Sequence, residues 1–274
     1  MALFDDVFNK ATIYEMLFFN VKAVLIYPTL FELKEGNPAL FERWKYISES
    51  KFNQSIDDVI PVSDIITNEY GQIQLYQNHV YQEKAVYYPE YSKILAITYA
   101  TLRSENGQLK RDLRKIVNGD EFTVIATFMD ILTMLSSEGV KSSPHFFPTL
   151  CGHNIMNYDI PMLIKRFLIH RSKFENKTLP LLLKKSLDSK PWESKIIDSV
   201  NVWKFNGNDY TPLMLIADYL GLKKTVDLDA LPVLSTTYWE TLKESPEKAL
   251  EYISLQSATQ TNLVVQLINE LRQL

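Results

Sequence analysis

The stretch Met16–Val24, MLFFNVKAV, constrains the fold of this chain more than any other. Short, nearly continuous apolar runs of this kind form central strands that are buried on both faces of a sheet. Two polar residues interrupt the run, Asn20 and Lys22, and side chains two positions apart on a strand point to the same face. An amide and an ammonium group in a core are unfavourable unless both find partners. The run therefore predicts either a less buried strand or the edge of a functional site.

Composition narrows the class of protein. The chain has 274 residues, of which 46% are hydrophobic, so it can bury a sizeable core. Its 29 basic and 33 acidic residues give a net charge of −4, so any contact with nucleic acid must come from a local patch. The single cysteine, Cys151, excludes an internal disulfide and suits a reducing compartment. We find no membrane-spanning run and no signal-peptide pattern, and we expect a soluble, cytoplasmic protein.

Strand-like and helix-like patterns alternate along the chain. Strands are predicted at 16–24, 94–102, within 146–155 and at the start of 196–205, and 107–119 is predicted to contain a turn or hairpin. Helices are predicted at 39–51, 122–135, 160–169, 181–187, 213–220 and from 246 to the end, whereas 52–82 has no clear pattern. This mixture favours a single α/β domain over 1–274, with 1–12 as a short lead-in.

Two further segments contain polar residues in suggestive positions. Residues 151–161 read CGHNIMNYDIP, in which Asp159 lies where a loop enters a helix. An aspartate at such a junction is commonly only a helix cap. Residues 251–256 read EYISLQ, in which Tyr252 and Gln256 lie one turn apart on one face of the last predicted helix.

With these segments the chain resembles the predicted 3′–5′ exonucleases that are related to the proofreading domain of family-B DNA polymerases. The resemblance is carried by LFFNVKAV (17–24), YQEKAVYYPEYSKILAITYA (81–100), LCGHNIMNYDIP (150–161), KPWESKIIDSVNVWKF (190–205) and ALEYISLQSATQT (249–261). It implies an RNase H-like fold, in which helices flank a mixed central sheet. It also implies the chemistry of a two-metal nuclease, in which four carboxylates hold two Mg²⁺ or Mn²⁺ ions about 3.5–4 Å apart.

Three of those four carboxylates are replaced in this chain. The family's Asp-x-Glu motif becomes Asn20 and Lys22. The aspartate of its second motif survives as Asp159, after Asn154 and Tyr158, and the third motif, Tyr-x₃-Asp, becomes Tyr252 and Gln256. The resemblance therefore places a vestigial catalytic site at Asn20, Lys22, Asp159, Tyr252 and Gln256.

The replacements are unfavourable for metal binding, because hard divalent ions need anionic oxygen ligands and a protonated lysine cannot act as one. We predict that no metal is bound, that Lys22 pairs with Asp159 in place of the metal, and that Asn20 and Gln256 hydrogen-bond around this pair. The alternative is a working site with Mg²⁺ or Mn²⁺ and carboxylates supplied from elsewhere. The candidates for such carboxylates are Glu15, Glu32, Asp198 and Glu251.

A basic segment follows the second motif. Between 165 and 195, nine lysines and arginines face only three acidic residues. The basic residues are Lys165, Arg166, Arg171, Lys173, Lys177, Lys184, Lys185, Lys190 and Lys195. We interpret Asn154, Lys184, Lys185 and Lys190 as candidates for nucleic-acid contacts; the alternative is a solvated loop.

These observations predict a degenerate, catalytically weak or inactive member of the exonuclease family that binds single-stranded DNA or 3′ ends. Two alternatives remain. One is an active metal-dependent 3′–5′ DNA exonuclease with a reconfigured site, and the other is a protein-interaction module that has kept only the scaffold.

Overall fold

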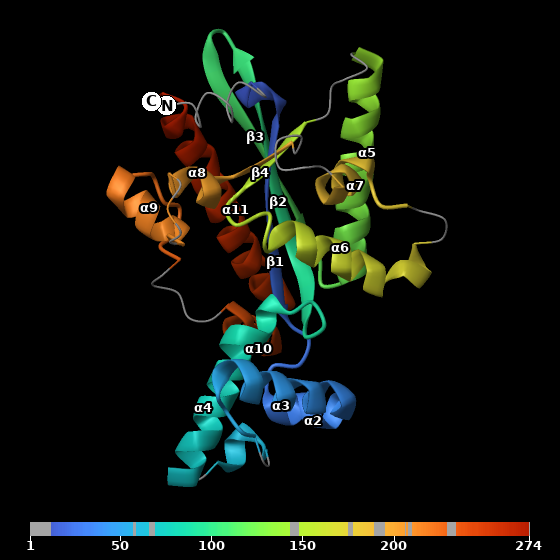
Figure 1. Cartoon of the computed structure of the whole chain (residues 1–274), viewed down its shortest axis with the longest axis vertical. Helices are drawn as coiled ribbons and strands as arrows, with labels where there is room; N and C mark the ends of the chain where they lie inside the picture. The colour runs from blue at the N-terminus through green and yellow to red at the C-terminus, as the bar shows by residue number, and fades with distance from the viewer. Residues whose placement is uncertain are drawn as a thin grey trace. The chain divides into compact units, whose positions relative to one another are not determined.

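The computed structural model describes most of the chain (Figure 1). The described residues are 12–56, 59–65, 69–142, 148–174, 178–188, 195–205, 207, 210–228 and 234–273, and of these 64, 137–142 and 186–188 are described by their backbone only. The chain divides into two compact units, which are treated separately below. Unit 1 comprises Met1–Lys22, Ile94–Leu231 and Leu250–Leu274, and unit 2 comprises Ala23–Lys93 and Pro232–Ala249.

A five-stranded mixed sheet forms the centre of the fold, in the order β3-β2-β1-β4-β5. The strands are β1 (Met16–Leu25), β2 (Ser92–Glu105), β3 (Gln108–Val117), β4 (Thr149–Gly152) and β5 (Ile196–Asp198). β2 and β3 are antiparallel, whereas β4 is parallel to both β1 and β5. β1 is the central strand, and every residue in it except Lys22 is buried, as the apolar run predicts. The α/β class is therefore confirmed.

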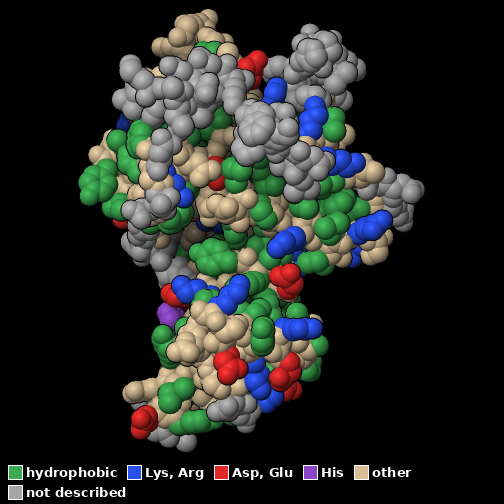
Figure 2. Space-filling model, viewed as in Figure 1, with side chains coloured by type: hydrophobic (Ala, Val, Ile, Leu, Met, Phe, Trp, Pro, Cys, Tyr) green, Lys and Arg blue, Asp and Glu red, His purple; other side chains and the backbone are tan. Residues whose placement is uncertain are grey.

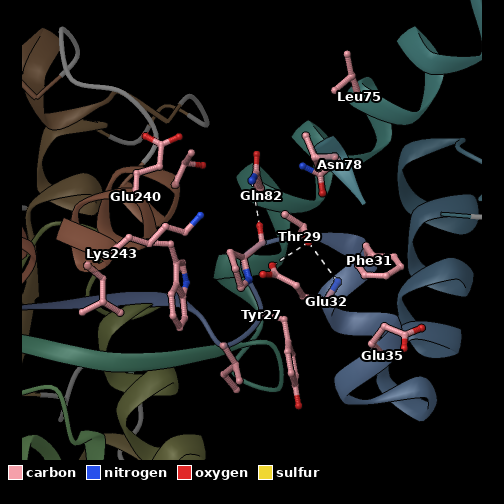
Figure 3. Close-up of a pocket in the computed structure, with 16 residues that line it drawn as sticks. Tyr27, Thr29, Phe31, Glu32, Glu35, Leu75, Asn78, Gln82, Glu240 and Lys243 are labelled. Atoms are coloured by element: carbon pink, nitrogen blue, oxygen red, sulfur yellow. Dashed lines mark hydrogen bonds between the residues drawn. The ribbon is translucent and has the colours of Figure 1, made fainter. Parts of the chain in front are cut away.

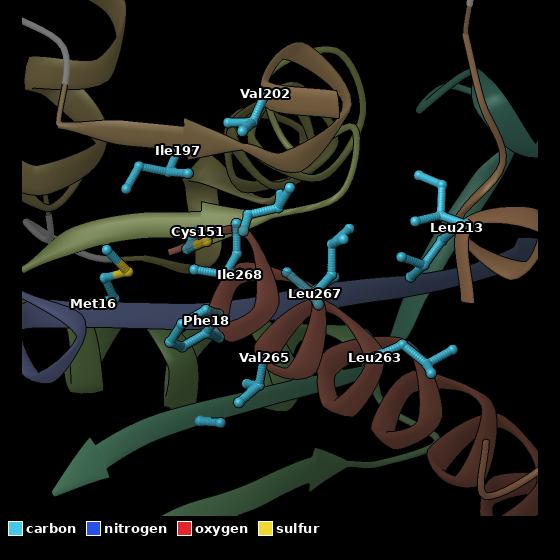
Figure 4. Packing of buried hydrophobic residues seen from close by; sticks show 14 of the residues in the cluster. Met16, Phe18, Cys151, Ile197, Val202, Leu213, Leu263, Val265, Leu267 and Ile268 are labelled. Carbon is cyan, nitrogen blue, oxygen red and sulfur yellow. The ribbon is translucent and has the colours of Figure 1, made fainter. Parts of the chain in front are cut away.

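Helices of unit 1 cover both faces of this sheet (Figure 1). They are α5 (Glu121–Ser142), α6 (Asp159–Ile169), α7 (Leu181–Asp188), α8 (Ser199–Trp203), α9 (Leu213–Leu220) and α11 (Pro246–Leu271). On one face Met16 and Phe18 of β1 belong to a core cluster with Leu267 and Ile268 of α11 (Figure 4). On the other face the Phe19 ring lies 5.3 Å from the ring of Phe128 in α5.

Unit 2 has its own aromatic core. Its helices are α2 (Leu30–Gly36), α3 (Pro38–Phe52), α4 (Glu69–Lys84) and α10 (Leu234–Glu244). The fully buried Trp44 of α3 makes edge-to-face contacts with Tyr81 at 5.3 Å and with Tyr91 at 5.4 Å. The Tyr81 hydroxyl donates to the backbone oxygen of Tyr27 at 2.9 Å, which ties α4 to the chain after β1. Four short 3₁₀ segments complete the described elements: Ile13–Glu15, Val62–Asp64, Ala85–Tyr87 and Arg171–Lys173.

Local side-chain and backbone features define several element boundaries. Asn37 caps α3 by accepting from the backbone N–H of Leu40 at 3.1 Å, and Ser245 caps α11 by accepting from Lys248 at 3.3 Å. The β2–β3 hairpin turns at Asn106 and Gly107, whose φ angles of 55° and 76° are those of a tight hairpin turn.

The sequence pattern did not predict α2, α4 or α10. In α4 the inward positions include Gln74 and Gln77, whereas Tyr70, Ile73 and Tyr76 are exposed. The usual apolar stripe of a helix is therefore absent from α4. The assignment of the whole chain to one RNase H-like domain stays a prediction.

Candidate functional site

The predicted site residues of unit 1 come from strands that end at one edge of the sheet. β1 and β5 are both parallel to β4. Because the carboxyl ends of parallel strands meet at the same edge, this edge combines Asn20 and Lys22 of β1, the 153–159 segment after β4, and Asp198 at the end of β5.

Asp159 is the first residue of α6, and its side chain is directed at β1. Its Oδ1 accepts a hydrogen bond from the backbone N–H of Val21 at 2.5 Å and another from Nδ2 of Asn20 at 3.3 Å. The pairing of β1 with β4 ends at Phe18. Beyond this point β4 offers no acceptor to β1, and Asp159 supplies one for the Val21 N–H. The residue that caps α6 is Tyr158, so Asp159 does not act as the helix cap that sequence alone allows. Asp159 fixes the second half of β1.

The charge state of Asp159 is set by its burial. Only 1% of the residue is exposed, and desolvation raises the pKa of Asp159 to about 7. The Val21 N–H and the Lys22 ammonium group pull this pKa down, whereas the charge of Asp198 pushes it up. Near neutral pH the carboxyl group of Asp159 is therefore divided between its ionised and protonated forms.

Lys22 does not form the predicted direct ion pair. Both residues are described, and no ion pair within 4 Å joins the Lys22 ammonium group to Asp159, although the two charges attract each other through space. The residue keeps intermediate exposure, but its ammonium group lies among enough protein atoms for desolvation to lower the pKa of Lys22 to about 8. Lys22 is thus a largely protonated cation at neutral pH, with no counter-ion within 4 Å among the described residues.

Helix α11 contacts Asn20 through a residue that the motifs did not indicate. The Ser257 hydroxyl donates towards the backbone oxygen and Oδ1 of Asn20, both at 3.3 Å. Gln256 is buried, but within the described part of the chain its amide makes no hydrogen bond to Asn20 or Asp159, contrary to the prediction. The Tyr252 hydroxyl is likewise buried without a hydrogen-bond partner among the described residues. Ser257 directly follows Gln256 in α11, but it is the Ser257 side chain that points towards Asn20 and contacts it.

Asp198 organises the loop between β4 and α6. Its Oδ1 accepts from the backbone N–H groups of Asn154 at 2.8 Å and Val200 at 3.0 Å, and its Oδ2 accepts from Met156 at 3.0 Å. Asn154 has a φ angle of 61°, so the chain turns sharply here, and its side chain accepts from Asn157 at 3.1 Å. Burial raises the pKa of Asp198. One sequence signal was available for this role of Asp198 as a backbone acceptor: an aspartate at the end of a strand, directly before a helix.

His153, in the same loop, is a structural histidine. Its Nδ1 lies 2.9 Å from the Ser199 hydroxyl, and its ring contacts the Tyr210 ring at 5.9 Å. Desolvation lowers the pKa of His153 to about 4, so the imidazole is neutral at physiological pH.

The site residues do not fit a pair of divalent ions. Within the described ranges, no group of three or more His, Cys, Asp and Glu side chains is arranged to hold a metal. The carboxylates of Asp159 and Asp198 are already engaged by N–H donors, and the neighbouring Lys22 adds a positive charge. Hard cations need several anionic oxygens, which this donor set lacks.

The other candidate carboxylates are not part of this edge. Glu15 accepts from the backbone N–H of Thr12 at 2.8 Å, in the 3₁₀ turn before β1. Glu32 belongs to unit 2, and Glu251 is exposed on α11. Of the four candidate carboxylates, Asp198 is the one whose charge acts on Asp159.

The basic segment is only partly available to a ligand. Lys184 and Lys185 are exposed on α7, whereas Lys190 lies outside the described residues. Arg166, counted in the basic segment, is 5% exposed and forms a buried ion pair with Glu121, so it does not contribute to a basic surface. On the face seen in Figure 2, lysines and arginines occur in several separate places, not as one continuous field.

Comparisons of the chain with family models, with curated proteins and with solved structures find no match. In the part of the chain that the structure describes, no helix has the length and apolar character needed to cross a membrane.

Proposed function

We propose that the chain is a degenerate relative of the 3′–5′ exonucleases that binds single-stranded DNA or a 3′ end and hydrolyses it weakly or not at all. The observation that carries this proposal is the state of Lys22. A cation lies beside Asp159, at the position that the resemblance assigns to a metal ligand, and it has no acidic partner within 4 Å in the described region.

Lys22 is suited to an anionic ligand. A desolvated ammonium group without a close counter-ion is unfavourable in the free protein, and a phosphate group would relieve that penalty. The neighbouring Asp159 is held by Val21 and Asn20 and is partly protonated near neutral pH, which weakens its repulsion of a phosphate. Under this proposal the ammonium group of Lys22 neutralises charge that metal ions neutralise in an active nuclease.

The RNase H-like fold is part of the same proposal. It is supported by the mixed sheet, by the central position of β1, and by helices on both faces of the sheet. It is also supported by the hydrogen bond between Asp159 and Asn20, which joins the first and second motifs of the resemblance although 139 positions separate them in sequence.

Salt-dependent binding tests the nucleic-acid contact. A single-stranded oligonucleotide labelled at its 5′ end is titrated with the protein at low and moderate salt, and fluorescence anisotropy is recorded in EDTA. Replacement of Lys184, Lys185 and Lys190 by alanine should weaken binding about tenfold at low salt. The log–log slope of affinity against salt should also become shallower by roughly 0.7 for each phosphate that the variant no longer neutralises.

The matched control replaces three lysines of unit 2, Lys45, Lys51 and Lys248, by alanine, with the same change in net charge. This control should bind as tightly as the unmodified protein. Absence of binding at low salt, or an equal loss in both triple variants, would remove the nucleic-acid proposal.

A second candidate is a protein-interaction module. It is favoured by the exposed apolar residues on α4 of unit 2, where Tyr70, Ile73 and Tyr76 are 56%, 50% and 61% exposed. Such surfaces often mark interaction sites. Failure of DNA binding together with an intact fold would favour this second candidate.

A further inference from the structure

Unit 2 contains a pocket of about 1040 Å³ between α2, α4 and α10 (Figure 3). All its lining residues belong to unit 2, so it is separate from the site on the sheet edge. The lining residues used below are Tyr27, Glu35, Leu75, Trp239, Glu240 and Lys243. In Figure 3, Glu240 and Lys243 come from α10, Glu35 comes from α2, and Leu75 comes from α4.

The walls of the pocket are aromatic and apolar, and they are held in place. The indole N–H of Trp239 donates to the backbone oxygen of Leu25 at 2.9 Å. The ammonium group of Lys93 lies 4.9 Å from the Trp239 ring, a cation–π contact. This ring therefore already attracts one cation, and its orientation does not depend on a ligand.

The charges that line the pocket are mainly negative. Among the described residues that line it, three are acidic, Glu32, Glu35 and Glu240, and one is basic, Lys243. Glu32 is engaged by the Thr29 hydroxyl at 2.8 Å, whereas Glu35 and Glu240 are exposed and form no ion pair with any described residue. Two carboxylates are thus free to pair with an incoming cation.

The net charge of unit 2 as a whole is also negative. It contains 13 acidic and 8 basic residues, whereas the rest of the chain has 20 acidic and 21 basic residues. A negative field around an apolar pocket attracts basic ligands and repels nucleic acid. The charge therefore identifies the class of ligand that this pocket accepts.

We propose that this pocket docks a segment of a partner protein that presents a lysine or arginine next to apolar side chains. The cationic group pairs with Glu35 on α2 or with Glu240 on α10, and the apolar side chains contact Tyr27 and Trp239. The rim favours a polypeptide over a small molecule, because Leu75 is 43% and Val62 is 41% exposed there. Small-molecule sites bury about 70–90% of their ligand, whereas exposed apolar residues at a rim suit a longer chain.

The test uses the full-length chain and two labelled twelve-residue peptides, one of alternating leucines and lysines and one in which every lysine is replaced by glutamate. Fluorescence anisotropy should detect binding of the basic peptide only. The double variant Glu35→Gln/Glu240→Gln should bind the basic peptide about tenfold more weakly at low salt, because both carboxylates that can pair with its lysines are lost. Lys243→Gln should bind it more tightly, because this change removes the repelling charge.

The matched control is Glu49→Gln/Glu69→Gln, which removes two exposed carboxylates of unit 2 outside the pocket. Its affinity should equal that of the unmodified protein. Hydrogen exchange should show protection by the peptide at 26–35 and 236–243. An equal loss in both double variants, equal binding of both peptides, or protection elsewhere would overturn the proposal. So would binding of hexyltrimethylammonium at this pocket without binding of the basic peptide.

Discussion

Replacement of Lys22 by methionine should make the fold more stable and should weaken DNA binding. The pKa of Lys22 is lowered from 10.5 to about 8, mainly because the ammonium group is desolvated. At about 1.36 kcal/mol per pKa unit, the charged form disfavours folding at pH 7 by up to about 3 kcal/mol. Lys22 keeps intermediate exposure, and the lost attraction to Asp159 opposes the gain. We therefore expect a net stabilisation of about 1–3 kcal/mol.

The dependence on pH gives this prediction a second readout. Between pH 8 and about 10.5 the unfolded chain binds a proton at Lys22 that the folded chain has lost, so stability should rise with pH in this window. The folded pKa of Asp159 is raised, to about 7, so its contribution should fall as pH rises from about 4 to 7. Lys22→Met should remove the first slope and extend the second to higher pH, because the charge of Lys22 lowers the pKa of Asp159. Asp159→Asn should remove the second slope.

Guanidinium unfolding followed by circular dichroism, repeated from pH 4 to 10.5, measures both effects. The control is Lys248→Met, at an exposed position for which neither a change in stability nor a change in slope is expected. A destabilisation of more than about 1 kcal/mol in Lys22→Met would contradict this prediction, since it would mean that the ammonium group is a stabilising partner of Asp159.

Three further predictions concern the same edge of the sheet. Asp159→Ala should destabilise the fold by about 1–3 kcal/mol, because the buried Val21 N–H loses its acceptor, whereas Asp159→Asn can still accept and should change stability less in the same unfolding assay. Gly152→Ala should destabilise the fold by about 1–3 kcal/mol, because the added Cβ would lie 2.9 Å from the Ile155 side chain and 3.1 Å from a β1 carbonyl oxygen. Its control is Gly119→Ala, where the added Cβ has no neighbour within 4 Å and no such loss is expected. The triple variant Asn20→Asp/Lys22→Glu/Gln256→Asp restores anionic ligands and should bind Mn²⁺ measurably by calorimetry; equal, negligible heats for this variant and the unmodified protein would contradict the assignment of these positions.

The parts of the fold that the sequence predicted depend on local chemistry. The apolar run of β1 requires burial on both faces, and Asn37-Pro38 and Ser245-Pro246 are helix starts that a few adjacent residues define. α4 could not be predicted in this way, because glutamines take inward positions and tyrosines take outward ones. Its place is set by tertiary packing instead of by its own periodicity.

The candidate site was predictable only in part, because its contacts join distant segments. The resemblance assigned Asn20 and Asp159 to one site, and the structure contains a hydrogen bond between them. The role of Asp159 as acceptor for Val21 depends on where the β1–β4 register ends, which no local pattern reveals. The expected Lys22–Asp159 ion pair failed for a similar reason, since a position in β1 and a position at the start of α6 do not fix the distance between the ends of the two side chains.

The proposal that Lys22 has replaced the metal site is tested most directly by a nuclease assay on a single strand labelled at its 5′ end, with the protein in EDTA and in millimolar Mn²⁺. We predict that the strand keeps its length in both conditions and binds equally well in both, and that Lys22→Met weakens binding about tenfold. Shortening of the strand from its 3′ end in Mn²⁺, abolished by Asp159→Asn, would contradict the proposal.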